Sequence, residues 1–157
     1  MNWQDIKISA DKKSFSFNGE RAFGKTFLYA MKFHSPGLAA VQDESGSFHI
    51  DTLGNELYKE RYTRTFGYYC NRASVVLEQK CFHLTERGIR AYTNSFVWTG
   101  NYQENLCTVR DNNNNYFHID LNGDRIYPIN FLYVGDYKDG FACVKTRNGY
   151  YRHVDTK

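Results

Sequence analysis

Four of the five histidines recur at one place in a repeated motif, and an aspartate follows three of them two residues later. The histidines are His49, His83, His118 and His153, and the aspartates are Asp51, Asp120 and Asp155. Side chains two residues apart on a β-strand point to the same face, so each imidazole would lie beside a carboxylate. Columns of such pairs could bind zinc or a similar ion. The alternative is that each pair hydrogen-bonds the neighbouring turn or link. We favour that structural role because a feature of every repeat serves the repeat, and we expect no metal and no cofactor.

A second candidate site is a column of mostly aromatic residues, one in each of four successive links: Tyr29, Arg64, Trp98 and Tyr133. Aromatic side chains with a polar tip suit an exposed recognition surface, at a protein interface or a sugar-stacking site. The simpler alternative is that they pack between repeats. Arg64 indicates partial exposure, because burial of an unpaired guanidinium would be costly. These four residues are the candidate binding residues.

No local motif for catalysis occurs in the sequence. It lacks the nucleophile elbow Gly-x-Ser-x-Gly, the zinc motif His-Glu-x-x-His and a phosphate-binding glycine loop. The glycines instead lie in turns that need a positive φ angle, which accounts for them without a ligand. We therefore expect no catalytic residue and no enzymatic activity.

A tandem repeat positions all of these residues. Its turn glycines are Gly19, Gly54, Gly88 and Gly123, which are separated by steps of 35, 34 and 35 residues. A fixed step in this range is typical of repeat architectures. Each repeat consists of two predicted strands and a longer aromatic-rich link, so the chain is expected to form five hairpins joined by four links.

We call the first strand of each repeat the opening strand, and the second, which carries the histidine, the His-Asp strand. The opening strands are predicted at residues 3–6, 38–41, 73–76, 106–109 and 141–144. The segments that follow them, such as 43–46 and 111–115, are rich in Asn, Asp and Gly, as hairpin turns are. Three of the links contain a further short predicted strand, at 27–30, 96–99 and 131–134.

Alternation along these strands predicts three core columns. The first column comes from the His-Asp strands and consists of Phe15, Ile50, Leu84, Ile119 and Val154. The second comes from the opening strands and consists of Ile6, Val41, Val76, Val109 and Val144. The third lies two positions earlier on the opening strands and is mostly small, with Gln4, Ala39, Ser74, Cys107 and Ala142. The opposite face of the opening strand is also apolar. A sheet that is wet on one side would alternate cleanly, so these sheets need cover on both faces.

A propeller and a tightly wound solenoid both provide such cover, since each sheet is covered by its neighbours. We therefore predict an all-β fold of tandem antiparallel β-hairpin repeats, about 35 residues each, in a propeller-like or solenoid array that is closed or nearly closed. Helix content should be low, because no window shows sustained helical spacing of apolar residues. Residues 1–157 are expected to form a single repeat domain.

The last two repeats resemble a known family. Segments 134–144 (Val-Gly-Asp-Tyr-Lys-Asp-Gly-Phe-Ala-Cys-Val) and 148–155 (Asn-Gly-Tyr-Tyr-Arg-His-Val-Asp) are similar to the unit of the bacterial WG β-repeat proteins, also called KWG repeats. That unit reads Gly-Leu-Ala-x-Val, a turn, Trp/Tyr-Gly-Tyr/Phe-Ile-Asp and x-x-Gly, followed by an aromatic-rich link. The likeness extends from about Trp3 to Lys157 and departs most in the repeat of Arg72, Ala73 and Thr85. It implies a repeat-built β-rich module and no particular reaction.

The composition of the chain restricts the partners and the cellular location that we expect for it. The net charge of +3 is small, and no run of Lys or Arg exceeds two residues, so we expect no nucleic-acid partner. No apolar stretch is long enough for a membrane span, and the first residues lack the order of a signal peptide. The cysteines could pair as disulfides, but we favour reduced structural thiols and a cytoplasmic location; they are Cys70, Cys81, Cys107 and Cys143.

Three functions fit these observations. The leading hypothesis is a non-enzymatic repeat module for protein–protein interaction, whose protein partner the sequence does not identify. The alternative is a lectin-like domain that binds glycans or surfaces with one weak site per repeat. A less favoured hypothesis is a metal-binding hydrolase that uses the His and Asp columns.

Overall fold

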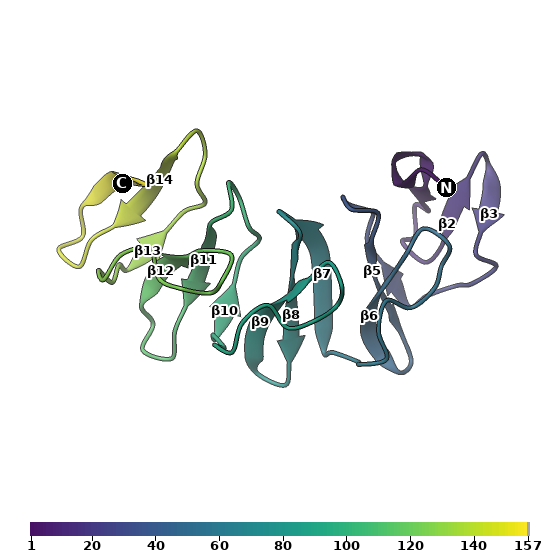
Figure 1. Cartoon of the computed structure of the whole chain (residues 1–157), viewed down its shortest axis with the longest axis horizontal. Helices are drawn as coiled ribbons and strands as arrows, with labels where there is room; N and C mark the ends of the chain where they lie inside the picture. Colours follow the sequence, from purple (N-terminus) through teal and green to yellow (C-terminus); the bar gives the residue numbers. More distant parts are fainter. Residues whose placement is uncertain (157) are drawn as a thin grey trace.

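The structure is a computed structural model that describes residues 1–156; Lys157, the end of the predicted fifth hairpin, lies outside the described residues. Fifteen β-strands form five three-stranded antiparallel sheets in this part of the chain. The sheets stand side by side in an open arc, with the two termini at opposite ends (Figure 1). The all-β repeat array is thus confirmed, whereas the preference for a closed or nearly closed array was wrong.

The sheets follow one another in chain order. Their strands are β1 (Lys7–Ile8), β2 (Phe15–Phe17) and β3 (Glu20–Ala22); β4 (Tyr29–Ala30), β5 (Ala39–Asp43) and β6 (Gly46–Ile50); β7 (Arg64–Tyr69), β8 (Arg72–Leu77) and β9 (Lys80–Thr85); β10 (Trp98–Thr99), β11 (Cys107–Arg110) and β12 (Tyr116–Ile119); and β13 (Tyr133–Val134), β14 (Phe141–Lys145) and β15 (Tyr151–Asp155). In the second to fifth sheets, a link strand pairs with the opening strand, which pairs with the His-Asp strand.

The first repeat differs from the prediction. Trp3–Asp5 forms a 3₁₀-helix instead of an opening strand. The Asn2 side chain caps it by accepting a hydrogen bond from the Gln4 N–H, an interaction that competes with strand pairing. Pairing begins only at Lys7, opposite Ser16, although the Ile6 side chain is still buried as predicted.

The third repeat is shifted by one residue from the prediction. Val75 pairs with Phe82 and is fully buried, so Val75 and not Val76 occupies the core column. Likewise Ala73, opposite Leu84, takes the place predicted for Ser74. Successive β-branched residues at 75 and 76 made the two registers hard to tell apart, and a slip of one residue exchanges the faces of a strand.

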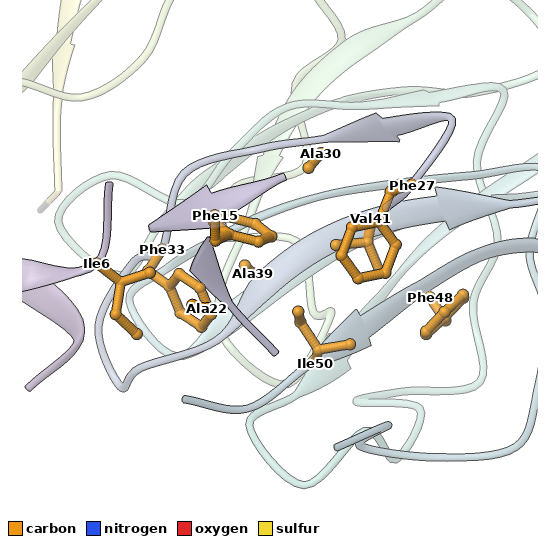
Figure 2. Close-up of a cluster of buried hydrophobic side chains, with 10 residues drawn as sticks. All are labelled: Ile6, Phe15, Ala22, Phe27, Ala30, Phe33, Ala39, Val41, Phe48 and Ile50. Carbon is orange, nitrogen blue, oxygen red and sulfur yellow. The ribbon is translucent and has the colours of Figure 1, made fainter. Parts of the chain in front are cut away.

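Buried side chains from both members of a pair fill the space between neighbouring sheets. Between the first and second sheets the cluster centres on Phe15, whose ring lies edge-to-face against Phe33, Phe27 and Phe23 at 5.1 to 6.1 Å between centroids. Figure 2 shows this cluster, with Ile50 and Val41 from the second sheet. Full burial of such a side chain contributes roughly 1.5–3 kcal/mol to stability. An equivalent cluster joins the third and fourth sheets through Leu84, Val109 and their neighbours.

The links also form hydrogen bonds across the gap between sheets. Before it enters the next sheet, each of three links pairs one residue with the preceding His-Asp strand, as Tyr62 does with Ser47 through two N–H···O bonds of 2.9 Å. The other two pairs are Phe96 with Cys81 and Phe131 with Tyr116. Each repeat is therefore fixed to its neighbour by both backbone and side chains. No helix within residues 1–156 has the length and apolarity to cross a membrane.

Candidate binding surface

The repeat histidines of the second to fourth sheets are fully buried and hydrogen-bonded through both ring nitrogens. In each, Nδ1 lies 2.6 Å from the hydroxyl of the tyrosine nine residues later, and Nε2 lies 2.7 to 2.9 Å from the backbone carbonyl seventeen residues later. The sets are His49 with Tyr58 and Phe66, His83 with Tyr92 and Gly100, and His118 with Tyr127 and Gly135. Because a carbonyl only accepts, Nε2 carries the proton and the tyrosine hydroxyl donates to Nδ1.

These contacts keep the histidines neutral. Burial lowers the pKa of His49 and of His83 to about 4, although the carbonyl of Phe66 or Gly100 opposes the shift. Burial also lowers the pKa of His118. Both nitrogens already have partners in the following link, so these histidines hold the repeats together, as the structural interpretation predicts. Within residues 1–156, no group of three or more His, Cys, Asp or Glu side chains could hold a metal. His153, on the last strand, is exposed.

The aspartates turn away from the histidines and organise the glycine turns. The Oδ1 atom of Asp51 accepts hydrogen bonds from the N–H groups of Leu53 and Asn55 at 2.8 and 2.9 Å. Asp120 does the same for the turn that begins at Asn122. Burial alone would raise the pKa of Asp51, but the hydrogen bonds from Asn55 and Leu53 outweigh it and lower the pKa. The paired His and Asp columns weighed as a metal site therefore serve two separate structural roles.

A second tyrosine in each following sheet completes the contact. The rings of Tyr68, Tyr102 and Tyr137 lie edge-on to the histidines, at 4.6 to 4.8 Å between centroids. Their hydroxyls donate to the carbonyls of Thr85, Asp120 and Asp155 at 2.7 to 3.0 Å. The sequence interpretation missed both sets of tyrosines, although their constant spacings of nine and nineteen residues from the histidine could have revealed them.

The candidate binding residues occupy one equivalent place in four sheets. Tyr29, Arg64, Trp98 and Tyr133 are the first residues of β4, β7, β10 and β13. The aromatic side chains are 41%, 43% and 48% exposed for Tyr29, Trp98 and Tyr133, and Arg64 is exposed as well. These side chains are therefore not fully buried between repeats, although the ring of Tyr133 packs against Tyr116 of the preceding sheet. Whether they bind a partner remains a prediction.

Two grooves at equivalent positions bring these residues together in pairs. The first, at the second and third sheets, is lined by Tyr29 and Arg64 together with Gln42 and Ser47. The second, at the fourth and fifth sheets, is lined by Trp98, Arg110, Tyr116, Tyr133 and Asp136, among others. The sequence interpretation missed Arg110 and Tyr116. Their signal is the strand register, in which Trp98 lies opposite Arg110, and Arg110 lies opposite Tyr116.

The second groove contains a row of three aromatic rings. The ring of Tyr116 lies 6.4 Å from that of Trp98 and 6.2 Å from that of Tyr133, and both pairs are tilted. The Arg110 guanidinium lies 5.8 Å from the centre of the Tyr116 ring. At the opposite wall, the Thr108 hydroxyl donates to the Asp136 carboxylate at 3.3 Å. The groove therefore combines flat apolar surfaces with one cationic and one anionic group.

Five stacked sheets, of which the second to fifth are joined by the same histidine and tyrosines, define a tandem β-repeat protein. Residues 119–151 match the model of the WG containing repeat, which supports the resemblance of the chain to the WG β-repeat proteins. No curated protein matches the sequence.

Solved structures with a similar arrangement share little sequence with the chain. The computationally designed Ika4 protein is 10% identical, with a TM-score of 0.49 over 78% of this chain and 87% of its own. The WD40 β-propeller domain of Doa1 is 12% identical, with a TM-score of 0.47 over 96% of this chain. BamB from Moraxella catarrhalis is 10% identical, with a TM-score of 0.49 over 96% of this chain. The chain spans 61% of the Doa1 structure's length and 55% of the BamB structure's length.

Proposed function

We propose that this chain is a non-enzymatic repeat module and that the face carrying Tyr29, Arg64, Trp98 and Tyr133 contacts another protein. The observation that carries the proposal is the exposure of Trp98 and Tyr133 around one groove. Large aromatic side chains are enriched at the centres of protein interfaces, where they bury much area at a small entropic cost. A row of them outside the core supports a recognition surface.

The environment of the reactive groups supports a function without catalysis. The repeat histidines His49, His83 and His118 are buried and use both ring nitrogens for structural hydrogen bonds. Burial raises the pKa of the Cys107 and Cys81 thiols, so neither is activated as a nucleophile. The cysteines are free thiols, which supports a cytoplasmic setting.

A pull-down with a paired variant tests the proposal. The double substitution Trp98→Ala/Tyr133→Ala should abolish the recovery of a partner that the unchanged chain captures, and should lower the melting temperature little because both side chains are exposed. The control is Leu53→Ala/Ile89→Ala, which removes two apolar side chains that are even more exposed, from two turns, and should leave the partner bound. If the Trp98/Tyr133 variant unfolds, those residues support the core and the proposal fails.

A lectin-like function is the second candidate. The observation that favours it is the presence of Arg110 and Asp136 beside the aromatic rings of the second groove, since sugars combine a stacking face with hydroxyl groups that need polar partners. A glycan array of broad chemistry distinguishes the two functions. Binding that Trp98→Ala abolishes would support the lectin, and a blank array would remove it.

A further inference from the structure

We propose that the groove at the fourth and fifth sheets binds a proline-rich segment of the partner in the polyproline II conformation. The inference rests on the proposed function, because it names the kind of partner segment that the aromatic column recognises. It depends on three features of the groove: a row of aromatic rings that is absent from the two preceding junctions, a glycine that makes room for the Trp98 ring, and a buried donor without an acceptor.

The first feature appears when equivalent positions of the repeats are compared. Residues that every repeat shares can be explained by packing, whereas residues specific to one junction need another explanation. At the fourth and fifth sheets the four groove positions are Trp98, Arg110, Tyr116 and Tyr133. The equivalent residues are Tyr29, Gln42, Ser47 and Arg64 at the second and third sheets, and Arg64, Val76, Cys81 and Trp98 at the third and fourth. The three-ring row is therefore not a requirement of the fold.

The second feature is a glycine two residues after each outer ring. A Cβ atom on Gly100 would lie 3.3 Å from Cη2 of the Trp98 ring, and one on Gly135 would lie 3.7 Å from the Tyr133 hydroxyl. In the repeats without the aromatic row, Met31 and Phe66 stand at this position. Gly100 leaves room for the indole ring of Trp98 along its strand, whereas a Cβ on Gly135 would make only an ordinary contact with Tyr133. The groove beside these rings is shallow, with a volume of about 450 Å³.

The third feature is the Nε–H group of Arg110. This atom is buried, and it has no hydrogen-bond partner in the part of the chain that the structure describes. Leaving a donor of a charged group buried and unpaired is costly, so a ligand acceptor that draws the Arg110 side chain toward the groove that it lines would relieve a penalty already present. The equivalent residues are Gln42, Val76 and Lys145, so this guanidinium also belongs to one junction alone.

A polyproline II segment matches all three features. Its backbone carbonyls point outward without internal hydrogen bonds, and its proline residues have no N–H, so it offers acceptors to a groove that offers a donor. Its pyrrolidine rings pack between flat aromatic side chains, and its stiffness reduces the entropy lost on binding. Asp136 in the same groove suits a basic residue beside the prolines and disfavours an acidic segment.

Isothermal titration of the full chain tests the inference. The probe is a decamer of L-proline followed by one arginine, and the comparison peptides are a decamer of L-glutamate and a Gly-Ser decamer. We expect the proline peptide alone to bind, with a Kd of roughly 10–500 µM, as weak single-motif recognition gives. Trp98→Ala and Arg110→Gln should each weaken binding about tenfold or more, as expected for central contact residues. Leu53→Ala, which removes an exposed apolar side chain that lines neither groove, is the control and should bind as the unchanged chain does.

Two further measurements keep the test sharp. Melting temperatures establish that each variant is folded, and Gly100→Ala, which displaces the indole ring by a few tenths of an ångström at most, should weaken the peptide without unfolding the chain. Absence of binding up to millimolar proline peptide, or binding that survives Trp98→Ala, overturns the inference. Preference for the glutamate decamer also overturns it and assigns the groove to an acidic segment. If the pull-down still depends on Trp98 and Tyr133 in these cases, the proposed function survives and only the proline-rich segment is rejected.

Discussion

At the scale of single residues, the repeats are held together by buried imidazoles whose two ring nitrogens are both hydrogen-bonded. His83 shows the arrangement: it is fully buried, accepts from the Tyr92 hydroxyl at 2.6 Å and donates to the Gly100 carbonyl at 2.9 Å. Buried polar groups are tolerated when they are paired, and an unpaired partner would cost about 1–3 kcal/mol. The histidine thus links its own strand to a residue of the following sheet, and it does so only in its neutral form.

Stability should therefore fall in mild acid. The pKa of His49 and of His83 in the folded chain is about 4, below the ordinary value of 6.5. Since the folded chain binds the proton more weakly than the unfolded chain, the contribution is complete above pH 6.5 and is lost as the pH falls towards 4. The loss reaches roughly 3 kcal/mol for each of these histidines. Urea denaturation at pH 7.0, 5.5 and 4.5 measures it.

The exposed repeat histidine provides the control for this experiment. His153→Gln should leave the unfolding free energy at pH 7.0 nearly unchanged, because its side chain lies outside the buried network. A free energy of unfolding that stays constant between pH 7.0 and 4.5 would contradict the assignment of neutral, structurally bonded histidines.

Among the elements, the glycine turn combines two requirements. Gly123 has a φ angle of +81°, which L-residues with a Cβ rarely adopt, and a Cβ there would lie 2.4 Å from Cγ of Tyr92. Tyr92 is the residue that donates to His83, so the turn of one sheet presses on the tyrosine that holds the histidine of the sheet before it. Gly88 and Tyr58 repeat the contact at 2.2 Å. The turn needs glycine both for its backbone conformation and for close packing.

A pair of substitutions separates these two requirements. Gly19 has the same φ, +82°, at the same turn position of the first repeat, but nothing lies within 4 Å of its Cβ direction. Gly19→Ala should therefore cost only the backbone strain, about 1–2 kcal/mol. Gly123→Ala should cost a further 1–3 kcal/mol or so, because Tyr92 must move. Equal losses for the two variants in chemical denaturation would show that the close approach is unimportant.

How much of the fold the sequence predicted depends on which structural property each sequence pattern reports. Turn glycines and alternation report local geometry, so they predicted the strands of the second to fifth sheets except β7 (Arg64–Tyr69), and the core positions of Ile50 and Ile119. They failed at Val75, where two β-branched neighbours allow two registers. They also failed at Trp3, where a side-chain cap favours a 3₁₀ turn.

The candidate site was predicted less completely for a different reason. The exposed column was found because its members share a place in the repeat. Its groove was not found, because Arg110 joins it through a cross-strand pair and not through a shared pattern. A search for regular repeats does not detect a residue that departs from the repeat. Such residues are nevertheless the ones that the fold alone does not explain.

Over the whole molecule, the arc behaves as a one-dimensional stack. The sheets lie side by side along the arc (Figure 1). From the second sheet onward, neighbours are joined through a histidine, two tyrosines and one backbone pair, whereas the first and second sheets are joined by the cluster around Phe15. In such arrays, stability is close to a sum of unit and nearest-neighbour terms, so units with two neighbours are more stable than units with one. The groove for which binding is proposed lies at the fourth and fifth sheets, close to one end of the described array.

Hydrogen exchange should accordingly vary along the arc. The third sheet has neighbours on both sides, and its His83 is fully buried, whereas the corresponding His153 of the fifth sheet is exposed. Under native conditions we expect amide protons of β8 and β9 to exchange at least about tenfold more slowly than those of β14 and β15, which corresponds to about 1.4 kcal/mol of additional opening free energy. Mass spectrometry of peptic fragments or NMR measures the rates.

Tyr102→Phe, which removes the hydroxyl bonded to the Asp120 carbonyl of the fourth sheet, should accelerate exchange in the third and fourth sheets more than in the first. Equal protection in all five sheets would mean that the array opens as one cooperative unit and would contradict the nearest-neighbour description.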